Sequence, residues 1–213
     1  MMDKRIEKTI ENLKRNNIEA FYAETLADAV TLVEGMLSEG ETISCGGSVT
    51  LAESGVFALM QSGKYNFLDR SLAKSPEETA EIYRKTFYAD TFLTSANAIT
   101  ENGELINVDG NCNRIAAITF GPKRVIVIVG KNKLVGDVNE GFYRVKTIAA
   151  PKNAQRLGLS TPCAKLGHCI KKDEAPSAGC DSEQRICVNY VISGRQRVAD
   201  RVKVIIVNEN LGY

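Results

Sequence analysis

The spacing of apolar residues along the chain predicts a series of helices. Apolar positions repeat with a helical period over residues 3–16, and the pattern stops at Asn16-Asn17. A second run of this kind extends from Thr25 to a stop near Gly40. The same period predicts further helices over residues 48–61, with Ser48 as a candidate N-cap, and over residues 137–157, with a break before Pro151.

The stretch "SPEETAEIYRK" contains the clearest helix start in the sequence. Ser75 is suited to the N-cap, Pro76 fits the first turn, and Glu78 stands where a capping box places its acidic partner. We therefore predict that a helix begins directly after Ser75.

Short β-branched and apolar runs between these segments predict strands. The runs are "IEAFYAE", "TISC", "YNFLD", "TFLTS", "RVIVIVG", "VNYVISG" and "VKVIIVN". Asn102-Gly103 lies between "AIT" and "LINVD", and this pair is typical of a hairpin turn. Residues 124–130 are apolar almost throughout, which indicates a central parallel strand that is buried on both faces.

Helix and strand alternate from Ile18 to about Gly130, which predicts an α/β sandwich with a largely parallel sheet. Right-handed crossovers bring successive strand ends to one edge of such a sheet, where ligands bind. Residues 160–188 are rich in Cys, Gly, Pro and Ser and have little periodicity. We expect one domain over residues 1–213, with the segment 160–188 as an irregular loop or small subdomain before the last strands.

Composition narrows the classes of protein and partner. The chain has 213 residues, of which 44% are hydrophobic and 25% charged, and its formal net charge is +1. These values fit a folded globular protein, and no block of like charges suggests a nucleic-acid or polybasic membrane-binding surface. The N-terminal stretch lacks the apolar core of a signal peptide, and no run is long enough for a membrane span. We expect a cytoplasmic protein whose six cysteines are reduced.

The stretch "SCGGSVT" joins a predicted strand to a predicted helix. Gly46 and Gly47 permit close approach of a ligand to the backbone, and the amides at a helix start attract anions. Ser48 and Thr50 add hydroxyl donors. The pattern is neither a Walker motif nor a dinucleotide fingerprint, so no nucleotide cofactor motif is identified. A plain tight turn is the alternative interpretation.

Residues 89–135, "ADTFLTSANAITENGELINVDGNCNRIAAITFGPKRVIVIVGKNKLV", together with "GGSVTLAESG" and "APKNAQRL", resemble the LUD, or lactate-utilisation, domain family. The resemblance covers roughly residues 5–210. It implies a Rossmann-like three-layer domain, similar to the sugar-phosphate isomerase and CoA-transferase group, with a pocket at the strand ends. Members of the family are linked to L-lactate oxidation with iron–sulfur subunits, and many single-domain relatives have no established activity.

The resemblance to the isomerases also implies site residues. Asp90, in the "AD" step, matches the acid that lines the substrate pocket and would act as acid or base. The alternatives are that Asp90 caps the entry to the strand, that Arg114 pairs with Asp109, and that the side chains of Lys131 and Lys133 are solvated. The polar loop positions that the resemblance matches, and that are expected to bind substrate beside the Gly-Gly-Ser turn, are Asn97, Asn111, Asn113 and Arg114. Lys131 and Lys133 follow the apolar strand and could add positive charge to the same site.

Two cysteines lie near this predicted site. Cys45 precedes the glycine pair, and Cys112 stands where the family's loop usually has glycine. If both loops meet, the thiols could act as nucleophiles, as a redox pair or as packing residues, and buried cysteines are common. The only histidine, His168, lies far along the chain, which disfavours a Cys/His catalytic pair.

The remaining cysteines, Cys163, Cys169, Cys180 and Cys187, fall within the irregular segment. Four thiolates could hold one Zn²⁺ or an iron–sulfur cluster, and free or redox-active thiols are the third interpretation. The intervals hold five, ten and six residues, without a two-residue knuckle. His168 could replace one thiolate, although a solvent-facing role suits it as well.

Two functions remain open at this stage. The first is a LUD-type domain that binds a small anionic metabolite, a hydroxy acid, phosphosugar or acyl-CoA, at the Gly-Gly-Ser turn, with the link to lactate utilisation that the family implies. The alternative is a non-catalytic accessory subunit of an iron–sulfur oxidoreductase, which docks or relays electrons through the Cys-rich segment. Catalysis and homo-oligomer formation are left open.

Overall fold

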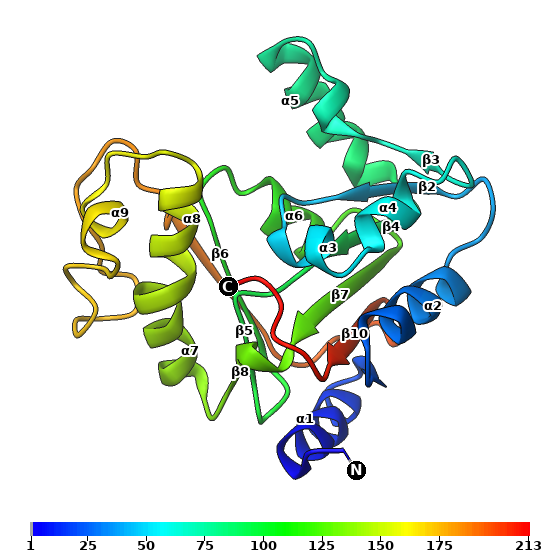
Figure 1. The fold of residues 1–213 in the computed structure, drawn as a ribbon, viewed down its shortest axis with the longest axis horizontal. Coiled ribbons are helices and arrows are strands. Elements are labelled where there is room, and N and C mark those ends of the chain that lie inside the picture. Colours follow the sequence, from blue (N-terminus) through cyan, green and yellow to red (C-terminus); the bar gives the residue numbers. More distant parts are fainter. Residues whose placement is uncertain (1) are drawn as a thin grey trace.

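A computed structural model describes residues 2–213, and it contains two β-sheets (Figure 1). All neighbouring strands of the larger, six-stranded sheet are parallel, as the alternation of helix and strand predicts. Its strands, in spatial order, are β1 (Glu19–Ala23), β10 (Val202–Val207), β7 (Arg124–Gly130), β4 (Thr91–Thr94), β2 (Thr42–Cys45) and β3 (Asn66–Phe67).

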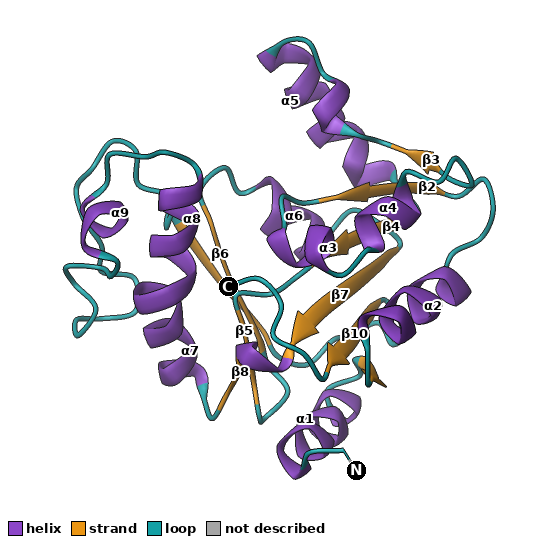
Figure 2. Cartoon of the chain, viewed as in Figure 1, coloured by secondary structure: helices purple, strands orange, loops and turns teal. Residues whose placement is uncertain are grey.

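Helices cover both faces of this sheet, so the fold is the Rossmann-like three-layer sandwich that the sequence predicts (Figure 2). One face packs against α1 (Lys4–Arg15) and α6 (Asn113–Thr119). The opposite face packs against α2 (Leu26–Met36), α3 (Val49–Glu53) and α4 (Val56–Met60). The other helices are α5 (Pro76–Lys85), α7 (Val138–Arg144), α8 (Ala150–Arg156) and α9 (Pro162–Leu166), and short 3₁₀ turns span Arg70–Leu72, Thr86–Tyr88 and Lys131–Lys133.

Strand β7 is the central strand expected from its apolar sequence. Val125, Val127 and Val129 lie on the face towards α1, while Ile126 and Ile128 lie on the face towards α2. All five residues are at most 1% exposed. Each face of β7 therefore contributes to a separate helix–sheet core, as burial on both sides of a parallel strand requires.

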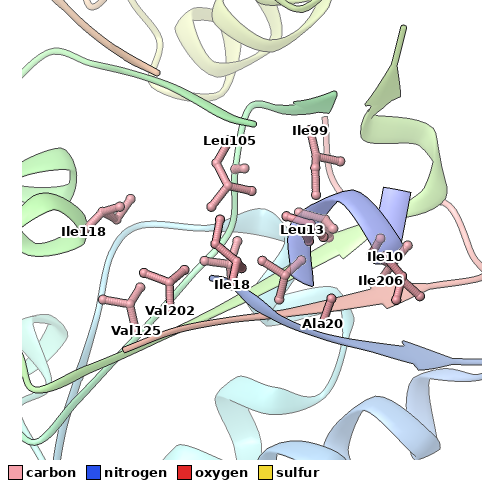
Figure 3. Packing of buried hydrophobic residues seen from close by; sticks show 14 of the residues in the cluster. Ile10, Leu13, Ile18, Ala20, Ile99, Leu105, Ile118, Val125, Val202 and Ile206 are labelled. Atoms are coloured by element: carbon pink, nitrogen blue, oxygen red, sulfur yellow. The ribbon is translucent and has the colours of Figure 1, made fainter. Parts of the chain in front are cut away.

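The smaller sheet has four strands in the order β8 (Leu134–Val135), β5 (Ala98–Thr100), β6 (Leu105–Asp109) and β9 (Asn189–Ser193). Strands β5 and β6 form the hairpin predicted around Asn102-Gly103. The sheet shares a core with the larger one, because Ile99 and Leu105 pack in the same cluster as Leu13 of α1 (Figure 3). The sequence did not predict this sheet, since β9 pairs with β6 across more than eighty residues.

Both serines predicted as N-caps accept a hydrogen bond from the first turn of their helix. Ser75 accepts a hydrogen bond from the backbone N–H of Glu78, and Ser48 accepts one from Leu51. The helix predicted over residues 48–61 is divided into α3 and α4, because Gly55 adopts a left-handed φ of 78° between them. Glycine reaches that backbone conformation without the steric cost that a Cβ imposes.

The predicted break before Pro151 takes the form of a π-helical turn over Val145–Ala149, between α7 and α8. Proline donates no backbone hydrogen bond and its ring crowds the carbonyl one turn earlier, so the preceding turn widens. Pro151 then occupies the first turn of α8, where no donor is needed.

The Cys-rich segment is irregular, as expected. After α9, residues 167–188 form turns and loops without a helix or strand. Two cations hold it. The buried Lys146 donates to the carbonyls of Lys171, Glu174 and Ala175, and the half-buried Arg185 donates to those of Ser177, Cys180 and Cys187. Across residues 2–213, no helix has the length and apolar character needed to cross a bilayer.

Candidate functional site

A cavity of about 340 Å³ lies at the carboxyl ends of β2 and β4. Its wall is built from the Gly-Gly-Ser turn, the loop after β4, the loop between β6 and α6, the 3₁₀ turn after β7, helix α8 and the C-terminal Tyr213. The sheet edge at which parallel strands end is the usual ligand edge of such folds. The cavity is large enough for a small metabolite.

The two glycines of "SCGGSVT" make room for arginine side chains. A Cβ on Gly46 would lie 2.9 Å from Cδ of Arg114, and one on Gly47 would lie 2.5 Å from Nη2 of Arg70. Both distances are too short for a real contact. The glycine pair therefore lets two arginine side chains lie against the turn, Arg114 through its aliphatic stem and Arg70 through its guanidinium group. Gly47, Ser48 and Thr50 line the cavity beside them.

The Arg114 side chain connects the loops of this wall through hydrogen bonds. Its Nε donates to Asp109 at 3.1 Å, and its Nη1 donates to Asn107 at 2.6 Å and to the carbonyl of Ser95 at 3.1 Å. Its Nη2 donates to Asn97 at 3.1 Å and to the carbonyl of Val108 at 3.0 Å. Because each nitrogen already has protein acceptors, Arg114 positions the β4 and β6 loops, and the predicted alternative of pairing with Asp109 is found.

The predicted asparagines reach the cavity from two loops. Asn97, Asn111 and Asn113 all line it. The Oδ1 of Asn97 accepts from the N–H of Val108 at 2.8 Å as well as from Arg114, which fixes the orientation of the amide. Its amide nitrogen makes no hydrogen bond within residues 2–213 and remains a donor for a ligand.

Lys133 lies in the cavity wall and is only 3% exposed. Its Nζ donates to Thr50 Oγ1 at 2.8 Å, to Ser95 Oγ at 3.0 Å and to the carbonyl of Ala96 at 3.2 Å. Burial, together with the positive charges of Arg144 and Arg114, lowers the pKa of Lys133 to about 7.

Arg144 is a second buried cation behind this wall, 6% exposed. It donates to the carbonyl oxygens of Asn132 and Asn97, and burial lowers its pKa to about 10. Within residues 2–213, neither Lys133 nor Arg144 forms an ion pair with a carboxylate. Buried charges without a counter-ion are costly, so an anionic ligand here would relieve them.

Two further arginines on the cavity wall were missed by the sequence analysis. Arg70 follows β3, donates to the hydroxyl of Tyr83 at 3.1 Å and lies over its ring at 5.8 Å. Arg156 of α8 donates to Tyr213 at 2.8 Å and to Asn153. The position of Arg70 just beyond a predicted strand and the presence of Arg156 in "APKNAQRL" were the available signals.

Asp90 lies at the other edge of the sheet, and the expectation that it shares the cavity with the glycine turn is wrong. Asp90 precedes β4, accepts from the N–H of Thr42 at 3.1 Å and pairs with Lys123 at 2.8 Å. The hydrogen bond from Lys123 holds the pKa of the Asp90 carboxyl below its usual value. At a rise of about 3.3 Å per residue, the four residues of β4 separate Asp90 from the cavity wall at Thr94 by roughly 13 Å. It is the strand-entry cap of the alternative interpretation.

Four other residues that the sequence analysis placed at or near the site also lie away from the cavity wall. Lys131 is exposed and donates to Asn208 at 3.3 Å. Gly46 contacts Arg114 but does not line the cavity. The thiols of Cys45 and Cys112 do not meet: Cys45 packs in the α2-side core, where burial raises its pKa to about 12, and Cys112 contacts Asn189. For Cys45 the structure agrees with a packing role.

The four other cysteines converge on a second cavity, whose volume is about 20 Å³. Cys169 and Cys180 are buried, and burial with the neighbouring thiols raises the pKa of Cys163. Within residues 2–213, however, no three His, Cys, Asp or Glu side chains are arranged to hold a metal ion. His168 is exposed and does not line this cavity. Both cavities are lined by Val145, the first residue of the π turn, and by Ala150, the residue that follows this turn. These two residues therefore lie between the cavities.

The charge of the first cavity restricts what it can bind. Within residues 2–213, three arginine side chains, those of Arg70, Arg114 and Arg156, line it together with the Lys133 amine, whose pKa is about 7, against one acidic side chain, that of Asp109. That carboxylate is neutralised by Arg114 and also accepts from the N–H groups of Arg114 and Ile115. The remaining positive potential favours an anion.

Solved structures of other proteins are similar to this chain. A DUF162 family protein from Deinococcus radiodurans is similar over 96% of this chain and 97% of its own, with 13% identity and a TM-score of 0.54. Ribose 5-phosphate isomerase A from Neisseria gonorrhoeae is similar over 65% of this chain and 69% of its own, with 14% identity and a TM-score of 0.36. A comparison with curated protein sequences gave no match. The sequence model of the LUD domain matches residues 6–207, and the chain therefore belongs to the LUD domain family.

Proposed function

We propose that this LUD domain binds a small anionic metabolite in the cavity at the ends of β2 and β4. The observation that carries the proposal is the excess of cations on the cavity wall, since the one acidic side chain there within residues 2–213, that of Asp109, is already neutralised by Arg114. Arg70 and Arg156 line the cavity, and within residues 2–213 each has a guanidinium nitrogen without a hydrogen-bond partner. The Asn97 amide adds a neutral donor on the same wall.

The ligand classes implied by the family share an anionic group. A hydroxy acid such as L-lactate, a phosphosugar and an acyl-CoA are the candidates, and the cavity volume of about 340 Å³ favours the two smaller ones. The link to lactate utilisation is part of the proposal, and L-lactate is therefore one of the anions to be titrated.

Calorimetric titration tests the proposal directly. L-lactate, ribose 5-phosphate and inorganic phosphate are titrated into the wild type and into Arg70→Gln and Arg156→Gln. A charge-assisted hydrogen bond contributes about 1.5–3 kcal/mol, so each substitution should weaken binding about 10- to 100-fold. Arg84→Gln, at an exposed position on α5 outside the cavity wall, is the matched control and should bind as the wild type does. Equal affinity in all variants would refute the site.

We further propose that the four-cysteine cavity holds one zinc ion that stabilises the irregular segment. In support, all four thiols line a single cavity, and its volume of about 20 Å³ suits one ion rather than a cluster of several iron and sulfur atoms. The sulfurs would have to move closer together around the ion, which turns and loops permit more easily than helices.

Elemental analysis of the purified protein tests this second proposal. One zinc per chain supports it, and a protein without metal contradicts it. Stoichiometric iron in a brown protein would instead support the alternative function, an accessory subunit of an iron–sulfur oxidoreductase that relays electrons through this segment.

A further inference from the structure

Lys133 has a chemistry that anion binding alone does not use. It is a primary amine in the cavity wall, 3% exposed, and within residues 2–213 it has no carboxylate partner. Lysines that lose their proton near neutral pH through burial and neighbouring cations are the ones that act as nucleophiles towards carbonyl groups. Here burial is the larger cause of the lowered pKa, and Arg144 and Arg114 are the neighbouring cations.

The hydrogen bonds of Lys133 suit a neutral amine as well as an ammonium. The ammonium can donate to Thr50, Ser95 and the carbonyl of Ala96. A hydroxyl can donate as well as accept, so a neutral amine could keep three bonds by accepting one from Thr50 or Ser95. Each hydroxyl also has another acceptor, Leu211 O for Thr50 and Ala96 O for Ser95, both at 3.5 Å. Rotation of either hydroxyl therefore frees the nitrogen lone pair.

Charged groups around the amine favour its neutral form. Arg144 and Arg114 both lower the pKa of Lys133, whereas Glu53 raises it and is the smallest of the contributions. Asp109, the only acidic side chain that lines the cavity within residues 2–213, is paired with Arg114. The rim arginines, Arg70 and Arg156, are placed to hold an anionic group in the same cavity.

We propose that the Lys133 amine forms a reversible imine with a ketone or aldehyde carbonyl of the small anion that the cavity binds. This inference rests on the proposed function and narrows its ligand to carbonyl-bearing anions, such as a 2-oxo acid or a ketose phosphate. The amine lone pair attacks the carbonyl carbon and forms a C–N bond, and a proton moves from nitrogen to oxygen. The remaining nitrogen proton then joins the hydroxyl, which leaves as water as the C–O bond breaks and the C=N bond of the imine forms, with no oxidant or reductant required.

Borohydride reduction traps such an imine as a stable secondary amine on the lysine. The full-length protein is incubated at pH 7.5 with pyruvate, or separately with dihydroxyacetone phosphate, in the presence of cyanoborohydride. Intact mass and peptide mapping then locate the adduct. We expect Lys133 to be labelled at least about tenfold faster than any exposed lysine, because its amine is neutral far more often. The arm that labels faster identifies the carboxylate or the phosphate as the anionic group.

Lys131 provides a matched control on the same 3₁₀ turn, because it is exposed and outside the cavity wall. Lys131→Met should label as the wild type does, and Lys133→Met should lose the fast adduct. Peptide mapping of the wild type needs no variant, so misfolding of Lys133→Met would leave the proposal testable. Labelling spread evenly over surface lysines would overturn it.

Calorimetry with inorganic phosphate and L-lactate, which carry no ketone or aldehyde, separates this inference from the proposed function. If either anion binds and no Lys133 adduct forms, the imine proposal fails and the anion site stands. If neither anion binds and no adduct forms, both proposals fail. If Lys133 is labelled and an excess of phosphate slows the labelling, both are supported.

Discussion

The substitution Gly47→Ala tests whether the glycine turn exists to hold Arg70 against the cavity. The added Cβ would lie 2.5 Å from Nη2 of Arg70, where ordinary contacts begin at 3.4 Å. The guanidinium must therefore move by about 1 Å, which is enough to break a hydrogen bond of about 2.8 Å to a bound anion. We expect anion affinity to fall about 10- to 100-fold, as the loss of one charge-assisted bond predicts.

Stability should respond much less than affinity does. The displaced group is the far end of a flexible side chain, and Gly47 has no left-handed φ that alanine would find strained. The free energy of unfolding should therefore change by less than about 1 kcal/mol. Gly35→Ala is the matched control, since its Cβ would meet no atom within 4 Å. Calorimetric titration and urea unfolding measure the two quantities, and wild-type affinity in Gly47→Ala would refute the reasoning.

Three further outcomes are expected. Gly103→Ala should lower the free energy of unfolding, measured in urea, by at least about 2 kcal/mol, because its Cβ would lie 2.6 Å from the backbone of Leu13 at a φ of 82°. Gly40→Ala, at a φ of 75° without a clash, should lower it by only about 1 kcal/mol, and equal losses in the two variants would contradict this reasoning. The pKa of Lys133 is lowered from 10.5 to about 7 by folding, so the unfolded chain binds more protons than the folded one between these pH values. The free energy of unfolding of the wild type, relative to that of Lys133→Met, should therefore rise from pH 7 to 9 by up to about 1.4 kcal/mol per pH unit. Parallel pH profiles of the two proteins would argue against the lowered pKa. Bound zinc should fall below one per chain in Cys180→Ser but not in His168→Ala, because only the cysteine lines the small cavity, and unchanged zinc in both variants would exclude a four-thiolate site.

Local sequence patterns determined most of the secondary structure. The apolar run of β7, the cap at Ser75 and the Asn102-Gly103 turn each depend on neighbouring residues, and all three are found. The family motifs likewise indicated the correct fold, because the alternation of helices and parallel strands is a property of the order of elements along the chain.

The predicted site was only partly correct, because its residues lie at opposite ends of strand β4. Asp90 and Asn97 lie close in sequence, but β4 runs between them, so Asp90 lies at the amino edge of the sheet and Asn97 at the carboxyl edge. Strand order along the chain does predict which loops meet at the ligand edge. The motif match to the isomerases assigned Asp90 to the site without requiring that the residue lie at the carboxyl end of its strand.

The sequence by itself determined the helices, the strands, the parallel sheet and the turn that forms one wall of the cavity, because these follow from periodicity and turn chemistry over short distances. Only the tertiary structure decided that Arg70 and Arg156 line the same cavity as that turn and that Lys133 is buried with no ion-pair partner within residues 2–213. Such facts depend on contacts between residues far apart in the chain, and burial, which sets the protonation of an amine, exists only once those contacts form.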